Sequence, residues 1–82
     1  MNDYKSIFSA NVRHCMDSNG LSNRAVADKI GVSYSTLQDW KTGSSPQNYF
    51  AVKKFCVMFG VKFEDIFFQD LTNQHVSMEN AS

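Results

Sequence analysis

The chain has 82 residues, of which 43% are hydrophobic and 13% aromatic, and its formal net charge is zero. This length suits one domain, and the apolar content excludes a disordered chain. No apolar run approaches the ~20 residues that cross a bilayer, and the first residues lack a signal-peptide pattern, so we expect a cytoplasmic protein with no membrane contact.

The first predicted helix covers residues 3–18. Apolar side chains recur there at spacings of three and four, which is the period of one helix face. They are Tyr4, Ile7, Phe8, Val12, Cys15 and Met16. Asn19 and Gly20 end this helix, because glycine accepts the left-handed conformation that closes a helix.

Two short helices follow, separated by a single glycine. Ser22 is the predicted N-cap of a helix that ends at Ile30, and Ser33 is the N-cap of a helix over residues 34–41. Gly31 stands between them, where the turn requires a positive φ. The predicted inward residues of the pair are Val26, Ala27, Ile30, Leu37 and Trp40.

The remaining predicted helices follow a turn at residues 42–46. Pro46 suits the first position of a helix capped by Ser45, and this helix continues over residues 47–59. Its predicted core stripe is Tyr49, Val52, Phe55, Cys56 and Phe59. A fifth helix covers residues 63–68, with Phe63, Ile66 and Phe67 on its inner face. From Gln69 onward apolar residues become sparse, which predicts a flexible tail over residues 69–82.

The predicted fold class is therefore all-α, with a compact five-helix domain over residues 1–68. Its second and third helices form a helix-turn-helix, a unit that places a helix in a DNA groove. Helices that cross steeply must approach closely, and the small Ala27 permits this approach.

The charges are unevenly distributed along the chain. All eight Lys and Arg residues fall within residues 1–62 beside four Asp, a net charge of +4, and residues 63–82 carry −4. A basic body with an acidic end is compatible with DNA binding by one face. Charge alone leaves open the alternative that these are ordinary solvated groups.

No sequence feature points to a metal ion, another cofactor or catalysis. Cys15 and Cys56 are isolated, which favours two buried thiols over a disulfide or a metal site. His14 and His75 have no paired ligand nearby and are expected at the surface. The chain has no phosphate-binding glycine loop and no nucleophile with a plausible base, so we expect neither an enzyme nor a small-molecule substrate.

The stretch LSNRAVADKIGVSYSTLQDWKTGSSP, followed by GVKFEDIF, resembles the Cro/C1-type (XRE-like) helix-turn-helix family of phage and bacterial regulators. The similar positions are the Leu-Ser opening, the small Ala27, the Gly31 turn, the apolar Leu37 and the glycine-containing loop. The resemblance covers residues 4–68. It implies a lambda-repressor-like DNA-binding domain that recognises double-stranded DNA, acts in transcription and is most often a repressor.

Three positions depart from the family pattern. Asn23 replaces a glutamine that contacts a phosphate and braces the recognition helix. Lys41 replaces an acidic residue, and Met16 occupies the place of its arginine partner, so the family's buried ion pair is expected to be absent and Lys41 free to face DNA. Lys62 replaces the cap of the fifth helix, which is therefore expected to begin differently.

The resemblance also implies the residues that contact DNA. Those expected to meet base edges are Tyr34, Ser35, Gln38 and Asp39. Those expected to meet the sugar-phosphate backbone are Asn23, Arg24, Ser33, Lys41, Thr42, Ser45, Gln47 and Asn48. The alternative for each is an ordinary exposed polar side chain, and it weighs most for Asp39, since an acid suits the groove only where it accepts from cytosine.

We further expect a homodimer on a palindromic operator, because one helix-turn-helix contacts few base pairs. Phe68 cannot share the inner face of the fifth helix, so Phe68 and Leu71 are predicted to form an exposed dimerisation patch. The alternative is that Leu71 and the tail fold back over Phe68 within one chain. A different function also stays open: an antitoxin-like protein-interaction module would suit the zero net charge.

Overall fold

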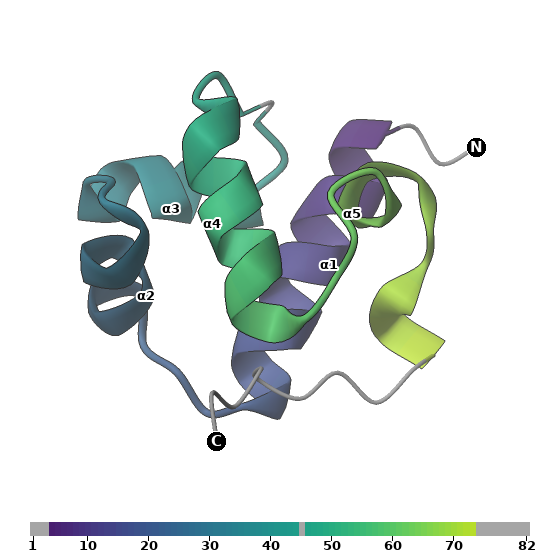
Figure 1. Cartoon of the computed structure of the whole chain (residues 1–82), viewed down its shortest axis with the longest axis horizontal. Coiled ribbons are helices and arrows are strands. Elements are labelled where there is room, and N and C mark those ends of the chain that lie inside the picture. Colours follow the sequence, from purple (N-terminus) through teal and green to yellow (C-terminus); the bar gives the residue numbers. More distant parts are fainter. Residues whose placement is uncertain (1–3, 45, 74–82) are drawn as a thin grey trace.

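The computed structural model describes residues 4–44 and 46–73, and within these ranges every regular element is helical (Figure 1). The elements are α1 (Tyr4–Ser18), α2 (Asn23–Ile30), α3 (Tyr34–Lys41), α4 (Tyr49–Phe59), α5 (Asp65–Phe68) and the 3-10 helix η1 (Leu71–Asn73). The predicted all-α class with five α-helices is confirmed.

Helices α1 and α4 form the middle of the molecule. Figure 1 shows α2 and α3 at one end, and α5 and η1 at the other. Helix α1 packs against α3, α5 and η1, whereas α2 packs against α3 and α4. The arrangement therefore holds the α2–α3 pair from two sides, by α1 and by α4.

The core is built on the apolar face of α1. Phe8, Val12, Cys15 and Met16 are fully buried, as their spacing predicts, and Ile7 is half-buried. Of Tyr4 only the backbone is described. The Phe8 ring meets the Trp40 indole edge-on, with 5.6 Å between ring centroids, and stacks on Phe67 at 5.1 Å. Such aromatic contacts add to the burial of large apolar surfaces and join α1 to both ends of the domain.

Cys15 and Cys56 are free thiols within this core. Burial raises the pKa of each thiol to about 12, so both stay protonated near neutral pH. The prediction of two buried thiols is confirmed.

The start of α4 differs from the prediction. The helix begins at Tyr49, and the Asn48 Oδ1 caps it by accepting from the Ala51 N–H at 3.2 Å. Ser45, the predicted cap, lies outside the described residues. Tyr49 is 54% exposed, so its predicted place in the core is wrong. It lies at the edge of the buried stripe, and its ring packs on Phe63 and Phe67.

Helix α5 is shorter than expected and begins at Asp65. The chain turns first, with the Asp65 N–H donating to the Lys62 carbonyl at 3.0 Å, and no side chain caps the helix. The expectation that this helix begins differently from the family pattern, without a side-chain cap at Lys62, is confirmed. Phe63 precedes the helix and is 39% exposed rather than buried, while Ile66 and Phe67 are buried as predicted.

A buried amide fixes the chain after α5. The Asn11 Nδ2 donates to the carbonyls of Ile66 at 3.0 Å and Gln69 at 2.6 Å, and its Oδ1 accepts from the Leu71 N–H at 2.9 Å. Leu71 is only 5% exposed. The first residues of the predicted tail are therefore held against α1, because the Asn11 side chain binds the Gln69 carbonyl and the Leu71 N–H there. Residues 74–82, with His75, lie outside the described part.

Replacing Asn11 tests this clamp. Asn11→Leu keeps the side-chain size and leaves three backbone groups without their partner. We expect the free energy of unfolding to fall by about 3 kcal/mol, since each buried polar group without a partner costs about 1–3 kcal/mol. Urea unfolding measures the loss. Gln69→Ala is the matched control, because its backbone carbonyl is unchanged. Equal losses in the two variants would contradict the clamp.

Candidate nucleic-acid interface

Helix α2 and the turn after it have the geometry that the sequence predicts. The Ser22 Oγ accepts from the Ala25 N–H at 3.2 Å, which caps α2. Gly31 has φ 78°, in the left-handed region, and its N–H donates to the Ala27 carbonyl at 2.9 Å. Ala27 is 2% exposed, so a small residue stands at the closely packed position. The turn thereby sets the direction in which α3 leaves α2.

Helix α3 is anchored at both ends and along its inner face. The Ser33 Oγ accepts from the Thr36 N–H at 3.2 Å and caps the first turn. Leu37 and Trp40 are buried, as predicted. At the other end, the Ser9 hydroxyl donates to the Trp40 carbonyl at 2.6 Å. Only the outward face of the helix is left for a partner.

The second bond at the end of α3 comes from Arg13, whose guanidinium donates to the Lys41 carbonyl. The last carbonyls of a helix have no partner within it, and a cation there also opposes the negative end of the helix dipole. Met16 is buried among apolar residues and Lys41 is no acid, so these two contacts from α1 hold α3 where the family's ion pair is missing.

The outward arc of α3 presents Tyr34, Ser35 and Gln38. All three side chains are exposed, Tyr34 by 55%. At 100° per residue, Ser35 lies near the middle of this arc, with Gln38 about 60° to one side and Asp39, which is also exposed, about 40° to the other, on the flank that faces the start of α4. The four residues predicted to contact bases therefore share the exposed side of α3.

The other flank of α3 is joined to α2 by side chains. The Lys41 Nζ donates to the Asn23 Oδ1 at 2.8 Å, and the Asn23 Nδ2 donates to the Gln38 Oε1 at 2.7 Å. The Lys41 ammonium thus has a protein partner, since it gives one of its three donors to Asn23, and its contact with DNA stays a prediction. Although one methylene shorter than glutamine, Asn23 does brace α3.

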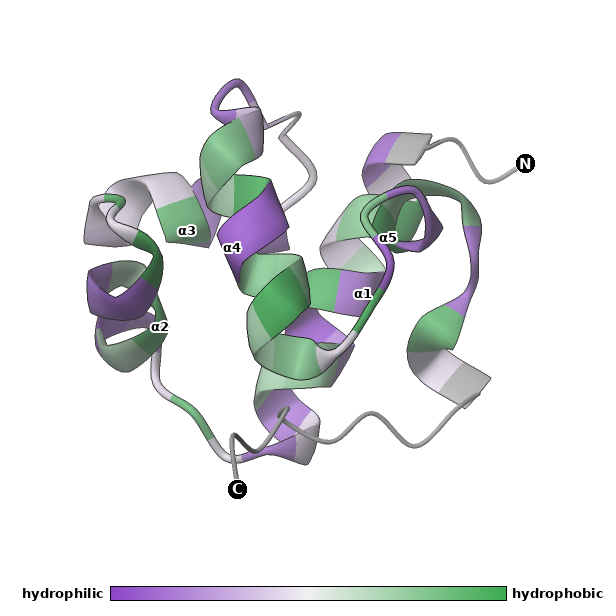
Figure 2. Ribbon diagram, in the orientation of Figure 1, coloured by the Kyte–Doolittle hydropathy of each residue, from purple (hydrophilic) through white to green (hydrophobic). Residues whose placement is uncertain are grey.

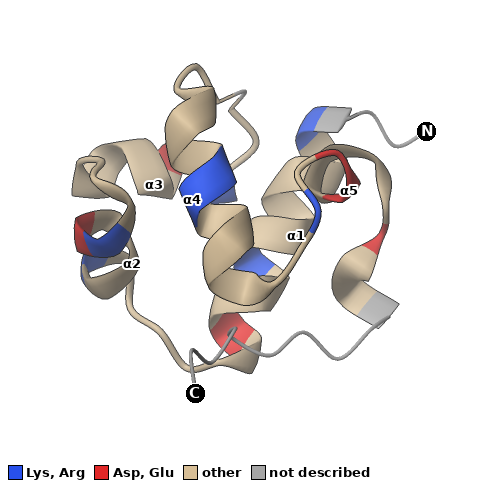
Figure 3. Ribbon diagram, viewed as in Figure 1, with Lys and Arg blue, Asp and Glu red and all other residues tan. Residues whose placement is uncertain are grey.

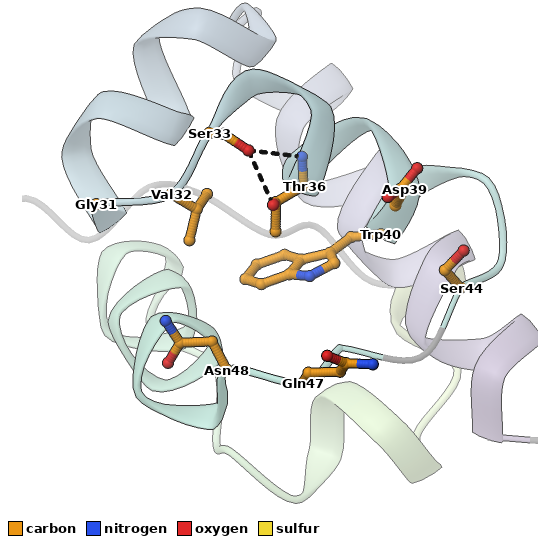
Figure 4. A pocket seen from close by; sticks show the side chains of 9 residues that line it. All are labelled: Gly31, Val32, Ser33, Thr36, Asp39, Trp40, Ser44, Gln47 and Asn48. Carbon is orange, nitrogen blue, oxygen red and sulfur yellow. Dashed lines mark hydrogen bonds between the residues drawn. The ribbon is translucent and has the colours of Figure 1, made fainter.

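A groove of about 540 Å³ separates α3 from the start of α4 (Figure 4). Trp40 occupies its centre, with Ser33 and Thr36 on one side and Gln47 and Asn48 on the other. Its lining is Gly31, Val32, Ser33, Thr36, Asp39, Trp40, Ser44, Gln47 and Asn48. Residues predicted to contact DNA from two separate chain segments therefore meet around one mostly polar groove, and Ser44 joins them without having been predicted.

Several predicted backbone-contacting side chains have structural partners. The Ser33 hydroxyl caps α3 and also donates to the Thr36 Oγ1 at 2.9 Å. The Thr42 hydroxyl reaches the Gln38 and Asp39 carbonyls at 3.2 Å. Asn48 caps α4. These groups shape the helix ends, whereas the exposed Arg24 and Gln47 take part in no such cap.

The charges of the described residues are partly segregated along the fold. Figure 3 shows basic residues on α1, α2 and α4, and acidic residues around α5 and the segment after it, but single acidic residues also stand on α1, α2 and α3. Within residues 4–44 and 46–73, no cluster of three or more His, Cys, Asp and Glu is placed to hold a metal ion. Among the helices of that part, none has the length and apolar character to cross a membrane.

Trp40 and Tyr34 are expected to respond differently to truncation. Trp40→Ala removes a buried indole between α1 and α4, and the loss of a large buried aromatic costs about 3–5 kcal/mol. We expect this variant to lose most of its cooperative thermal transition, while Tyr34→Ala melts within a few degrees of wild type. Circular dichroism during heating measures both. A folded Trp40→Ala protein would contradict the anchoring role of the indole.

A family model described as helix-turn-helix matches residues 12–66. The match starts within α1, contains α2, α3 and α4 completely and ends in α5. No curated protein and no solved structure matches the chain. The resemblance drawn from the sequence is confirmed for this span.

Proposed function

Because the chain belongs to the Cro/C1-type helix-turn-helix family of DNA-binding transcription regulators, we propose that it represses transcription as a homodimer on a palindromic operator. The observation that carries this proposal is the outward arc of α3, whose polar side chains stand exposed on a helix anchored on its other faces. A fixed helix with free polar side chains suits the major groove. We propose no catalytic activity and no small-molecule substrate.

Base recognition is proposed for Tyr34, Ser35 and Gln38. Their exposure leaves hydroxyl and amide groups available, and these groups pair with base edges in the major groove. We assign Asp39 a secondary role, since its carboxylate lies beside the groove at α4 and suits only a cytosine amino group or a neighbouring donor.

Phosphate contacts are proposed on both sides of α3. Arg24 is exposed in the first turn of α2, and Gln47 and Asn48 precede α4. Backbone N–H groups at a helix start favour an anion, so the starts of α2 and α4 are suited to the two phosphate strands. Ser33 and Thr42 would support these contacts by capping the two ends of α3. Lys41 would support them through its hydrogen bond to Asn23. For Ser45, which the described part omits, a phosphate contact stays a prediction.

Dimerisation is proposed to depend on Phe68. This ring is 72% exposed, whereas Leu71 is buried against α1, so the predicted patch of both residues does not form. The chain folds back after α5, as the intramolecular alternative expected, but leaves Phe68 uncovered. A palindromic operator would require a contact through Phe68 to hold the two reading helices on half-sites about one turn, or ~34 Å, apart.

An interaction module is the second candidate function, and the outer face of α4 favours it. Phe50 is 82% and Val57 65% exposed there, with Lys53 and Lys54 between them (Figure 2). Exposed apolar patches of this kind often mark binding sites for proteins. Binding to duplex DNA at moderate salt discriminates between the two functions, because a module that works only through protein contacts has no affinity for DNA.

The DNA assignment predicts a steep salt dependence. With about five phosphates neutralised per dimer, log K should fall against log salt with a slope of about −4 to −5. Arg24→Ala should weaken binding to every duplex equally. Ser35→Ala should weaken an operator selected from randomised duplexes far more than random DNA, by a factor of about 5 to 150. Fluorescence anisotropy measures both, and a flat salt response would overturn the assignment.

The dimer is tested by Phe68→Asp, with Phe50→Asp as the matched control. Both rings are largely exposed, but the lysines beside Phe50 oppose the pairing of two identical faces. We expect Phe68→Asp to sediment as a folded monomer and to lose operator binding while weak nonspecific binding persists. Phe50→Asp should remain a dimer. The reverse result would move the interface to α4.

A further inference from the structure

Three polar side chains form a hydrogen-bonded chain that starts at the end of α3, passes through the start of α2 and returns to the middle of α3. Lys41 donates to Asn23 at 2.8 Å, and Asn23 donates to Gln38 at 2.7 Å. Lys41 and Asn23 are half-buried, whereas Gln38 is exposed on the outward arc. The chain therefore connects a partly buried charge to a side chain that faces the solvent.

The direction of these bonds follows from the chemistry of the first member. An ammonium group has three donors and no acceptor, whereas an amide presents an acceptor on one side and donors on the other. Asn23 must turn its oxygen toward Lys41, and so its NH₂ faces Gln38. Gln38 must in turn present its oxygen to Asn23, which leaves the Gln38 NH₂ for a partner outside the protein.

Resting on the proposed function, we propose that Lys41 is a specificity-determining positioning residue that makes Gln38 a hydrogen-bond donor toward DNA. A glutamine that pairs with adenine uses its oxygen and its NH₂ together. Here one lone pair of the oxygen accepts from Asn23 and turns the oxygen toward α2, so the N–H groups are the part of the amide that points to the base. Guanine, with its N7 and O6 acceptors, is the base that suits such a group best, and cytosine, with an amino donor, suits it least.

The position of Lys41 is itself fixed. Its carbonyl accepts from Arg13 of α1, so the backbone from which the side chain extends is tied to the core. A hydrogen bond from a charged donor is about twice as strong as a neutral one, which favours this amide orientation over its reverse. Lys41 thus acts on base recognition without touching the base.

Reversing the charge at residue 41 should reverse the chain of bonds. In Lys41→Glu the carboxylate only accepts, so Asn23 turns its NH₂ toward residue 41 and its oxygen toward Gln38. Gln38 then gives its NH₂ to Asn23 and presents its oxygen outward. We expect the preferred base opposite Gln38 to change from guanine to cytosine or adenine, whose amino groups donate.

The experiment uses four duplexes that differ at one base pair of an operator selected with the wild-type protein. Wild type should bind the guanine duplex at least about tenfold more tightly than the cytosine duplex, and Lys41→Glu should invert this order. Lys41→Met, which has no charge to orient Asn23, should show a much smaller difference. Gln38→Ala should abolish the preference in both the wild-type and the Lys41→Glu background.

A measurement without DNA separates this inference from the proposed function. Nuclear magnetic resonance of the free protein should show slow hydrogen exchange for the Asn23 NH₂ and fast exchange for the Gln38 NH₂. In Lys41→Glu the Gln38 NH₂ should become slow, because it now donates to Asn23, while the Asn23 NH₂ stays slow because it donates to residue 41. Unchanged fast exchange of the Gln38 NH₂, or an unchanged guanine preference in a folded Lys41→Glu protein, would overturn the role of Lys41. Failure of wild type to bind any duplex would instead overturn the proposed function, and base recognition by Gln38 with it.

Discussion

The buried indole of Trp40 is the contact on which the position of α3 depends. It packs edge-on against Phe8 of α1 and against Phe55 of α4, with centroids 5.6 and 6.3 Å away. The carbonyl of the same residue accepts from Ser9 of α1. One residue therefore supplies both the apolar and the polar attachment of the helix. Eight residues are too few for a stable isolated helix, so α3 needs these tertiary contacts to exist at all.

Attachment at Trp40 divides α3 into a held side and a free side. Its inner residues and its final carbonyls are committed to α1 and α4, and one flank is joined to α2 through Asn23. What is left is the exposed arc of Tyr34, Ser35, Gln38 and Asp39. Discrimination between bases requires side chains on a rigid backbone, because a donor that moves away from its acceptor no longer has the distance and angle of a hydrogen bond. The rigid attachment and the exposed arc are thus two aspects of one arrangement.

Apolar periodicity and turn chemistry predicted most of this fold from the sequence. The spacing in α1 located Phe8 and Val12 in the core, and Gly31 took the positive φ that its place between two short helices required. The same method failed where a buried polar side chain holds the fold together through hydrogen bonds to the backbone. Asn11 is fully buried, yet its identity carries no sign of the three backbone groups that it meets 55 to 60 residues away.

The candidate site was predictable in outline but not in its contacts. The register of α3 identified its exposed residues, because which side faces outward follows from the buried Leu37 and Trp40. The link between Lys41 and Asn23 depends on how closely α2 approaches the end of α3, and sequence spacing does not specify that distance. The predicted start of α4 was wrong for a local reason. Serine and asparagine are both good N-caps, so the sequence alone does not choose between Ser45 and Asn48, and the path of the loop decides where the helix begins.

The amide of Asn11 has a consequence for the order in which the molecule assembles. Its bonds to Ile66, Gln69 and Leu71 close loops of more than fifty residues, and such closure is entropically costly until the intervening chain has become compact. The α2–α3 pair, by contrast, joins residues near in sequence and forms through local contacts. The segment after α5 would then dock last and detach first. Detachment of this segment would be a partial unfolding event. It would expose the side of α1 that carries Asn11, while the attachment of α3 through Trp40 persists.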